Sequence, residues 1–350
     1  MSTKSVDAAR LAGFIEKLFM KLGTDREHAV LVADSLVRAD LEGVTSHGVL
    51  LLPMYVGRIE AGGISLTGRP EITDDLGGLV VMSANHCLGQ ISSAMATDLA
   101  IERARIHGVA TVAVRHAAHF GAGAYWARRA AAQGMVGMAF CNTRPLMPAP
   151  GGAQSLVGNN PLCIAFPSAQ GTPLIVDMAT SASAVGKIRL AMLNGKDIPV
   201  GWATDSEGKD TTSPAEALKG MLLPAAGPKG FGLAVAIDLL CGAISGGSLS
   251  TSVRPLYGTL SDFYDCAHTF MVIDASRLNK GRGITEEVDA LANAIRSSKK
   301  APGSQHVYAP GDLERERSRQ NNGICRLSPE LAHEMAALAK RFDIESPIAP

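Results

Sequence analysis

The chain has 350 residues, of which 46% are hydrophobic and 19% are charged, so it is long enough to bury a sizeable core in one or two domains. Its 33 basic residues balance its 33 acidic residues, and this zero net charge argues against nucleic acid or a membrane surface as the main partner. The six cysteines form no CxxC pair, which argues against a zinc ribbon, a redox motif or a disulfide framework. We interpret them as buried thiols of a cytoplasmic protein.

The N-terminal segment is expected to be helical. Residues 1–19 include Asp7 and Glu16 and lack an uninterrupted apolar run, so they do not resemble a signal peptide. Apolar residues from Val6 to Leu22 recur at three- and four-residue spacings, which predicts an amphipathic helix. A second helix is predicted after a capping-box pattern at Thr24 and Glu27. The motif TSHG at 45–48 is therefore expected on the turn before a third helix.

From about residue 70 onward, short β-branched runs separated by glycines predict a sheet. These runs are 80–82, 109–114, 136–140, 163–166 and 174–176. Helices are predicted at about 91–106, 125–133, 230–245, 286–297 and 329–342. The most apolar run, 231–244, is shorter than the roughly 20 residues that span a bilayer, so we interpret it as a buried helix. The predicted fold class is α/β, of a mixed α+β kind.

One region has an unbalanced charge. Between Arg103 and Val176 there is no acidic residue, whereas six arginines and three histidines are present from Arg103 onward. This pattern favours a bound anion, and the glycine turns at 119–123 and 150–152 offer backbone N–H groups to phosphates. The alternative is that the arginines pair with acids elsewhere, and we favour it for Arg128 and Arg129. The sequence leaves both interpretations open.

Two histidines are candidate acid/base residues. His47 and His119 stand in glycine-bearing turns, where an imidazole stays accessible and is suited to donate a proton near neutral pH; a purely structural role is the alternative. Ser46 either orients His47 or caps the following helix. His116 and His119 form an HxxH pair without a third ligand of suitable spacing, so we predict no metal site.

Neither glycine-rich turn matches a common nucleotide motif. Gly121 and Gly123 follow a predicted strand, but Trp126 occupies the third glycine position of the dinucleotide fingerprint and no acidic residue follows some twenty positions later, so a Rossmann domain is excluded. Lys229 precedes the long apolar helix, where a cation suits a phosphate or carboxylate site; a solvated loop lysine is the alternative.

Six sequence blocks occur in the order and spacing of the type-2 malate/L-lactate dehydrogenase family. They are TSHGVLLLPMYVGRI, AVRHAAHFGAGAYW, GNNPLCIAFP, VDMATSASAVGKIRLA, LLPAAGPKGFGLAVAIDLL and VYAPGDLE. The chain resembles this family over nearly its whole length. Relatives of the family include ureidoglycolate dehydrogenase, sulfolactate dehydrogenase, 2,3-diketogulonate reductase and Δ1-piperideine-2-carboxylate reductase.

The resemblance implies an activity and an architecture. It implies hydride transfer between NAD or NADP and the 2-oxo or cyclic 2-imino carbon of a small carboxylic acid, giving products such as malate, lactate, sulfolactate or ureidoglycolate. It also implies a homodimer with a non-Rossmann cofactor-binding sheet domain, at 69–310, and a helical domain built from residues 1–68 and 311–350. A lyase or isomerase that acts on a 2-hydroxy acid without a nucleotide, or a non-catalytic relative, are the alternatives.

The resemblance further assigns site residues. The acid/base is the residue matching His47 in some members, with Ser46 beside it, and the residue matching His119 in others. The matching cofactor positions are His119, Phe120, Gly121, Thr143, Asp177, Met178, Ala179, Lys229, Ala309, Pro310 and Gly311.

Two departures from the family pattern concern the substrate. Leu51 and Met54 stand where many relatives have arginines, the first of which helps bind the acidic group of the substrate, and Asn159 stands where threonine is common, at a position implicated in substrate contact. We hypothesise that Arg144, or else Arg189, binds the substrate carboxylate, because a planar guanidinium is its natural bidentate partner.

Overall fold

The computed structural model describes residues 3–278 and 281–348. Its centre is a seven-stranded mixed sheet in the order β2-β3-β4-β10-β5-β8-β9, in which β3 and β4 are parallel and every other neighbouring pair is antiparallel. The strands are β2 (Glu71–Asp75), β3 (Leu79–Ser83), β4 (Val109–Ala117), β5 (Val136–Cys141), β8 (Leu162–Phe166), β9 (Leu174–Met178) and β10 (Cys266–Ile273). The five predicted strands are confirmed, but β10, in the middle of the sheet, was not predicted.

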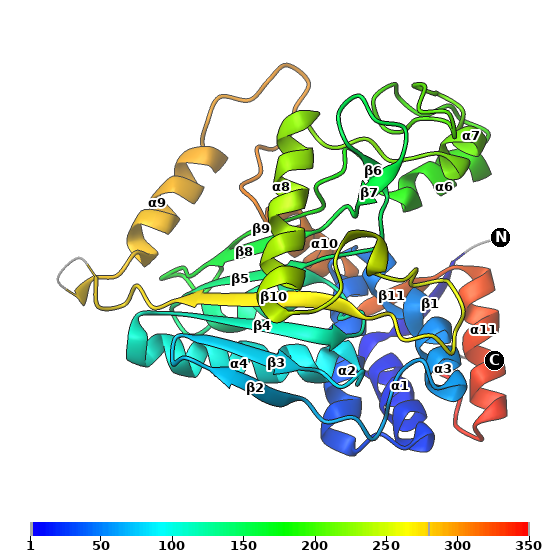
Figure 1. Ribbon diagram of the computed structural model, residues 1–350, viewed down its shortest axis with the longest axis horizontal. Coiled ribbons are helices and arrows are strands. Elements are labelled where there is room, and N and C mark those ends of the chain that lie inside the picture. The colour runs from blue at the N-terminus through cyan, green and yellow to red at the C-terminus, as the bar shows by residue number, and fades with distance from the viewer. Residues whose placement is uncertain (1–2, 279–280, 349–350) are drawn as a thin grey trace.

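Helices cover both faces of the sheet (Figure 1). The helices α4 (Gly89–His107) and α5 (Gly123–Ala131) pack on one face and bury a core that includes Trp126 and Phe270. The helix α8 (Pro228–Asp238) and the π-helical turn Leu239–Ala243 lie on the other face.

The interpretation of 231–244 as a buried helix holds for only one side of the helix. Leu233 is 39% exposed, Leu239 51% and Ile244 41%, because this helix covers the sheet with one side only. Along the part of the chain that the structure describes, no helix is both long and apolar enough to cross a membrane.

The two ends of the chain meet in a helical part. The helices α1 (Ala8–Leu22), α2 (Arg26–Leu41), α3 (Leu52–Ala61) and α11 (Pro329–Arg341) share one hydrophobic core. The strand β1 (Lys4–Asp7) pairs with β11 (Ile324–Leu327), which follows α10 (Asp312–Asn321). The helix α2 does not begin at the predicted capping box, because the carboxylate of Asp25 accepts the N–H of His28 at 2.9 Å and caps the helix.

A third, smaller hydrophobic core was not predicted from the sequence. It packs around Met147, Ile188 and Leu222, and its elements are β6 (Met147–Pro148), β7 (Ser155–Val157), α6 (Val185–Leu193), α7 (Pro214–Lys219) and the start of α8. The remaining elements are α9 (Thr285–Arg296) and the 3-10 turns η1 (Thr45–His47), η2 (Val49–Leu51) and η4 (Ser250–Ser252).

Candidate active site

Two histidines that are far apart in the sequence face each other where the helical part meets the sheet. His47 lies on the turn η1 after α2, and His119 lies in the loop between β4 and α5. Their ring centroids are 5.7 Å apart and the rings are nearly parallel, at 21°. The Ser46 hydroxyl lies 3.0 Å from Nδ1 of His47. The fold therefore brings together the three residues that the sequence singled out for acid/base chemistry.

A chain of hydrogen bonds fixes the proton of His119. The N–H of Gly121 donates to Nδ1 of His119 at 3.3 Å, and the hydroxyl of Tyr55 lies 2.8 Å from the same nitrogen. The side-chain amide of Gln90 donates to the Tyr55 oxygen at 3.0 Å, which leaves the Tyr55 proton for His119. Because a backbone N–H can only donate, Nδ1 is an acceptor, and neutral His119 carries its proton on Nε2.

The two imidazoles differ in their electrostatic environment. Burial lowers the pKa of His119 to about 3, and the neighbouring His47 and His268 add to this shift. Burial alone lowers the pKa of His47. His119 therefore stays neutral even in weakly acidic solution, and burial favours the neutral form of His47 as well.

The low pKa of His119 predicts a pH dependence of stability. Unfolded His119 titrates near its ordinary pKa of 6.5, whereas the folded group titrates near 3, so between these values the unfolded chain binds a proton that the folded chain does not. Stability from this group is thus lost as the pH falls below about 6.5. We expect the Tm of the wild type to fall more between pH 7.5 and 5 than that of His119→Gln, as measured by calorimetry. His333→Gln, a change of an exposed histidine on α11, should follow the wild type, and equal slopes in all three proteins would contradict this account.

A buried carboxylate supports the turn that carries His47. Oδ2 of Asp40, on α2, accepts the N–H of Val49 at 2.9 Å, and burial raises the pKa of Asp40 to about 7. A Cβ added at Gly48 would lie only 2.2 Å from Oδ1 of Asp40. This contact explains why glycine follows His47, a point that the sequence alone did not reveal.

The candidate cofactor residues Asp177 and Met178 lie at the end of β9. The Asp177 carboxylate accepts the N–H of Ala124 at 2.9 Å, in the first turn of α5. The N–H of Gly152, in the second glycine turn, donates to Ala149 O at 2.8 Å. The N–H of Gly152 and that of Gly121 in the first glycine turn therefore have acceptors within the protein, so the expectation of N–H groups open to phosphates does not hold for these two.

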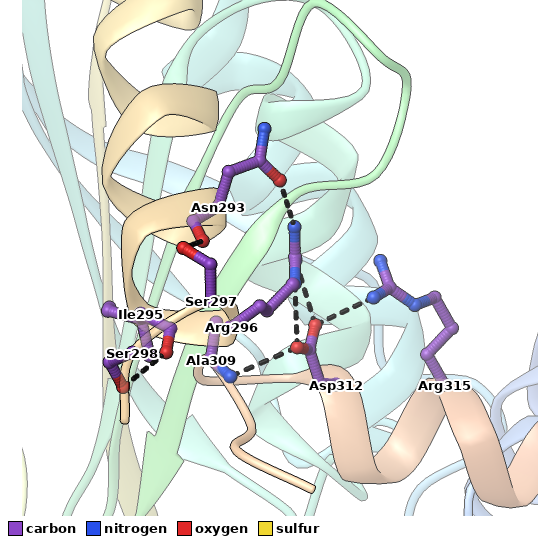
Figure 2. A network of polar contacts seen from close by, with 8 residues as sticks. All are labelled: Asn293, Ile295, Arg296, Ser297, Ser298, Ala309, Asp312 and Arg315. Atoms are coloured by element: carbon purple, nitrogen blue, oxygen red, sulfur yellow. Dashed lines mark hydrogen bonds and ion pairs between the residues drawn. The ribbon is translucent and has the colours of Figure 1, made fainter. Parts of the chain in front are cut away.

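A polar network around Asp312 joins the segment Ala309–Gly311 to α9 and α10 (Figure 2). Asp312 accepts the N–H of Ala309 at 3.0 Å and two hydrogen bonds from Arg296, at 2.8 and 2.9 Å; Arg315 donates a further bond at 2.7 Å. The carbonyl of Pro310 accepts the N–H of Ile175 at 3.2 Å. Two candidate cofactor segments that are distant in the sequence are therefore neighbours.

Thr143 and Asn159 also meet. The Thr143 hydroxyl donates to Oδ1 of Asn159 at 3.1 Å, and its N–H donates to Oδ1 of Asn160 at 2.9 Å. Asn160, which the sequence analysis did not single out, also donates to the carbonyl of Ala234 and so joins this pair to α8. The first turn of α8 carries the exposed Lys229.

Two candidate side chains lie in the interior of the protein. Leu51 is 1% exposed and belongs to the helical core, so a core residue occupies the arginine position of the family pattern. The Phe120 ring is 4% exposed and packs edge-on against His268 at 4.4 Å. His116 contacts the hydroxyl of Ser83 and the ring of His86 instead of the partners of His119.

Most arginines of the region without acidic residues pair within the protein. Arg103, Arg128 and Arg129 form ion pairs with Asp75, Glu42 and Asp98, respectively. Arg105 and Arg115 donate to Gln133 and Ser245. Within residues 3–278 and 281–348, Arg144 alone of the six has no hydrogen-bond acceptor, and its charge opposes the rise that burial causes in the pKa of Tyr264. Pairing with acids therefore holds for three of the arginines, Arg105 and Arg115 have neutral acceptors, and Arg144 is left as the candidate for a bound anion.

Comparison with known proteins decides the family. The malate/L-lactate dehydrogenase family model matches residues 6–335. The chain belongs to this family. It is thus a dehydrogenase of the kind that acts on 2-hydroxy acids, and hydride transfer is favoured over the lyase or isomerase alternative.

Several proteins are similar to this chain over almost its whole length. Malate dehydrogenase of Pyrococcus horikoshii is 35% identical over 347 residues, covering 96% of this chain and 95% of that protein. The structure of sulfolactate dehydrogenase from Methanocaldococcus jannaschii has a TM-score of 0.92 at 32% identity and covers 97% of this chain and 98% of its own. The structure of Δ1-piperideine-2-carboxylate reductase from Pseudomonas syringae has a TM-score of 0.85 at 27% identity, and the match covers 96% of this chain and 100% of that chain.

Proposed function

We propose that this enzyme uses NADH or NADPH to reduce the 2-oxo or cyclic 2-imino carbon of a small carboxylic acid, and catalyses the reverse oxidation of the 2-hydroxy acid. The observation that carries the proposal is the pair of facing imidazoles of His47 and His119, at the junction of the helical part and the sheet. When bound, the nicotinamide supplies or accepts the hydride. The protein must then move one proton and hold the substrate in line.

His47 is the acid/base in this proposal, and His119 is a hydrogen-bond donor to the substrate oxygen. In reduction the imidazolium of His47 gives its proton to the substrate oxygen or nitrogen, and in oxidation the neutral ring removes it. The pKa of His119 near 3 makes a protonated His119 scarce, yet its neutral ring carries a proton on Nε2 that can polarise a carbonyl. Tyr55 and Gln90 keep it in that tautomer.

The residues along β9 fit a dinucleotide. Ala309–Gly311 and Asp177–Ala179 provide the candidate strip, and Thr143 and Lys229 provide further polar groups. Beside Pro310 lies a cavity of about 430 Å³, lined by Arg296, Lys300, His306, Tyr308, Arg315 and Arg319 among others. Its excess of cations and its exposed Tyr308 ring suit the phosphates and flat bases of a nucleotide.

Arg144 is the proposed anchor for the substrate carboxylate. Because it has no acceptor among the residues that the structure describes, its five donors are free for a bidentate contact. We expect Arg144→Ala to raise KM for the 2-oxo acid by about tenfold or more, and Arg144→Lys to recover only part of the loss. Steady-state kinetics with saturating nucleotide measure this effect. Arg189→Ala, on α6, is the matched control, and a larger KM change in that variant would move the anchor to Arg189.

A spectrophotometric screen at the absorbance of reduced nicotinamide tests the function. Purified protein is mixed with NADH or NADPH and with pyruvate, oxaloacetate, 3-sulfopyruvate, diketogulonate or Δ1-piperideine-2-carboxylate, and the matching hydroxy acids and ureidoglycolate are run in reverse. Oxidation of one nucleotide with one substrate would support the proposal and fix both partners. The absence of turnover, together with no calorimetric binding of either nucleotide, would favour the non-catalytic alternative.

We further propose a cytoplasmic homodimer. The six free cysteines are all buried, which suits a reducing compartment, and the exposed apolar row Leu233, Leu239 and Ile244 offers a face for a second copy. Leu239→Lys should shift the mass measured by sedimentation from dimer toward monomer. Leu76→Lys, which changes a 79% exposed leucine on the β2–β3 turn, should leave the mass unchanged. An unchanged mass in Leu239→Lys would place the interface elsewhere.

A further inference from the structure

Two thiols and one imidazole meet in the core of the sheet. Cys141 lies at the end of β5, and Cys266 and His268 lie at the start of β10. Their exposed fractions are 4%, 0% and 0%. One ligand atom from each residue lies within 4.8 Å of the other two, and Sγ of Cys266 is 3.3 Å from Nε2 of His268.

The strand order creates this cluster. The strand β10 lies next to β5 in register, so that His268 is directly opposite Cys141. Cys266 and His268 are two residues apart, and the register against β4 shifts between them. In the sequence these cysteines are expected to be separate thiols, because no local pattern identifies β10 as the neighbour of β5.

The spacing of the cluster is close to that of a coordination shell. Three atoms that lie within 4.8 Å of one another all fall within about 2.8 Å of a common point, and Zn²⁺ binds sulfur at about 2.3 Å and imidazole nitrogen at about 2.0–2.1 Å. A contraction of about 0.5 Å for each sulfur and about 0.75 Å for the nitrogen brings the three atoms to bonding distance.

The chemistry of the cluster selects the kind of ion. Thiolate and imidazole are the ligands of thiophilic ions, whereas magnesium and calcium prefer oxygen. Two thiolates and a neutral imidazole around a divalent cation have zero net charge, so the filled site adds no uncompensated charge to the core. Nδ1 of His268 is buried without a hydrogen-bond partner among the residues that the structure describes, and Nε2 of the same ring faces Sγ of Cys266 at 3.3 Å.

We propose that Cys141, Cys266 and His268 form a buried binding site for a thiophilic divalent cation, with Zn²⁺ as the ion that fits best. In the metal-free protein the Cys141 thiol donates to the carbonyl of Asn142 at 2.9 Å, and the Cys266 thiol donates to that of Ala117 at 3.5 Å. Binding replaces the two S–H protons by the ion, and both protons leave to solvent. The ion then links β5 to β10.

The site is distinct from the reacting groups but close to them. The His268 ring packs against Phe120, which precedes Gly121 and follows His119, and Asn142 and Thr143 directly follow Cys141. The ion links the end of β5, which leads to Asn142 and Thr143, to the start of β10, where His268 contacts Phe120. Its expected effect is therefore on stability rather than on the proton transfer.

Metal analysis of the full-length protein tests the proposal. Protein is produced in zinc-supplemented medium, desalted over a chelating resin and measured by elemental analysis, and a cobalt-supplemented preparation is examined for thiolate-to-cobalt absorption. We expect about one Zn²⁺ per chain, a rise in Tm when Zn²⁺ is present, and a thiolate-to-cobalt band. Cys141→Ser, Cys266→Ser and His268→Asn should each retain at least tenfold less metal, whereas Cys325→Ser, which changes a buried cysteine on β11, should retain as much as the wild type.

Two outcomes would overturn the proposal. Wild-type protein that retains no Zn²⁺ from the supplemented medium and shows no change in Tm has no such site, whatever the variants do. Equal retention by the wild type and by folded Cys266→Ser and His268→Asn would place the ion elsewhere. Circular dichroism of each metal-free variant shows whether it is folded, so that a loss of metal is not confused with a loss of structure.

Discussion

Replacing His47 by alanine is expected to lower kcat by about a hundredfold or more, because the proton for the substrate oxygen then has to come from water. The KM for the nucleotide should change little, since His47 is not among the candidate cofactor residues. Single-turnover measurements of nucleotide oxidation, made beside steady-state kinetics, separate the chemical step from product release. In Ser46→Ala only the 3.0 Å contact with Nδ1 of His47 is lost, and a smaller reduction is expected.

The matched variant is His119→Ala. In the proposed scheme it also lowers kcat, but it should leave the pH dependence that His47 imposes on kcat/KM, whereas His47→Ala should remove it. If His119→Ala removed the pH dependence and His47→Ala kept it, the two roles would be exchanged. Near-normal turnover in both variants would contradict the proposal that either histidine acts as the acid/base.

The sheet could be predicted only in part from the sequence. The strands β3, β4, β5, β8 and β9 were recognised as short β-branched runs between glycines. The strand β10 enters the sheet from far along the chain and lies between β4 and β5, so that Phe270 pairs with Val112 on one side and with Ala139 on the other. Such pairing depends on contacts between distant residues, which no local pattern encodes, and the Cys141, Cys266 and His268 cluster remained unseen for the same reason.

The candidate site, like the sheet, could be predicted only in part from the sequence. His47, His119, Thr143 and Asn159 were located from motif position, and the fold brings them together in two pairs. Tyr55 and Gln90, the partners that determine the chemistry of His119, were not predicted from the sequence. A large polar residue on a buried helix face requires a hydrogen-bond partner, so Tyr55 was the available signal for the contact with His119. The burial of Leu51 in the helical core was not predicted either, since a motif position does not tell which way its side chain points.

The second large effect is expected at the glycine after His47. In Gly48→Ala the new Cβ would lie 2.2 Å from Oδ1 and 2.4 Å from Cγ of Asp40, much closer than van der Waals contact. The carboxylate cannot simply turn away, because it is buried and accepts the N–H of Val49. The turn that carries His47 must therefore shift. A displacement of about 1 Å of a catalytic group costs about a hundredfold in rate, so we expect kcat/KM to fall by tenfold to a hundredfold and the Tm to fall by several degrees.

A double variant separates this steric effect from other consequences of the substitution. Asp40→Ala removes the carboxylate that the new methyl group would strike, at the cost of leaving the N–H of Val49 without its acceptor. If the clash causes the loss, Asp40→Ala/Gly48→Ala should be more active than Gly48→Ala alone, and the two losses should be clearly less than additive. Additive losses would mean that the turn depends on the backbone conformation of Gly48 and not on the clash with Asp40. Recovery in the double variant would instead show that Asp40 and Gly48 act as one unit, in which a buried carboxylate can hold the turn under His47 only because the residue above it has no side chain.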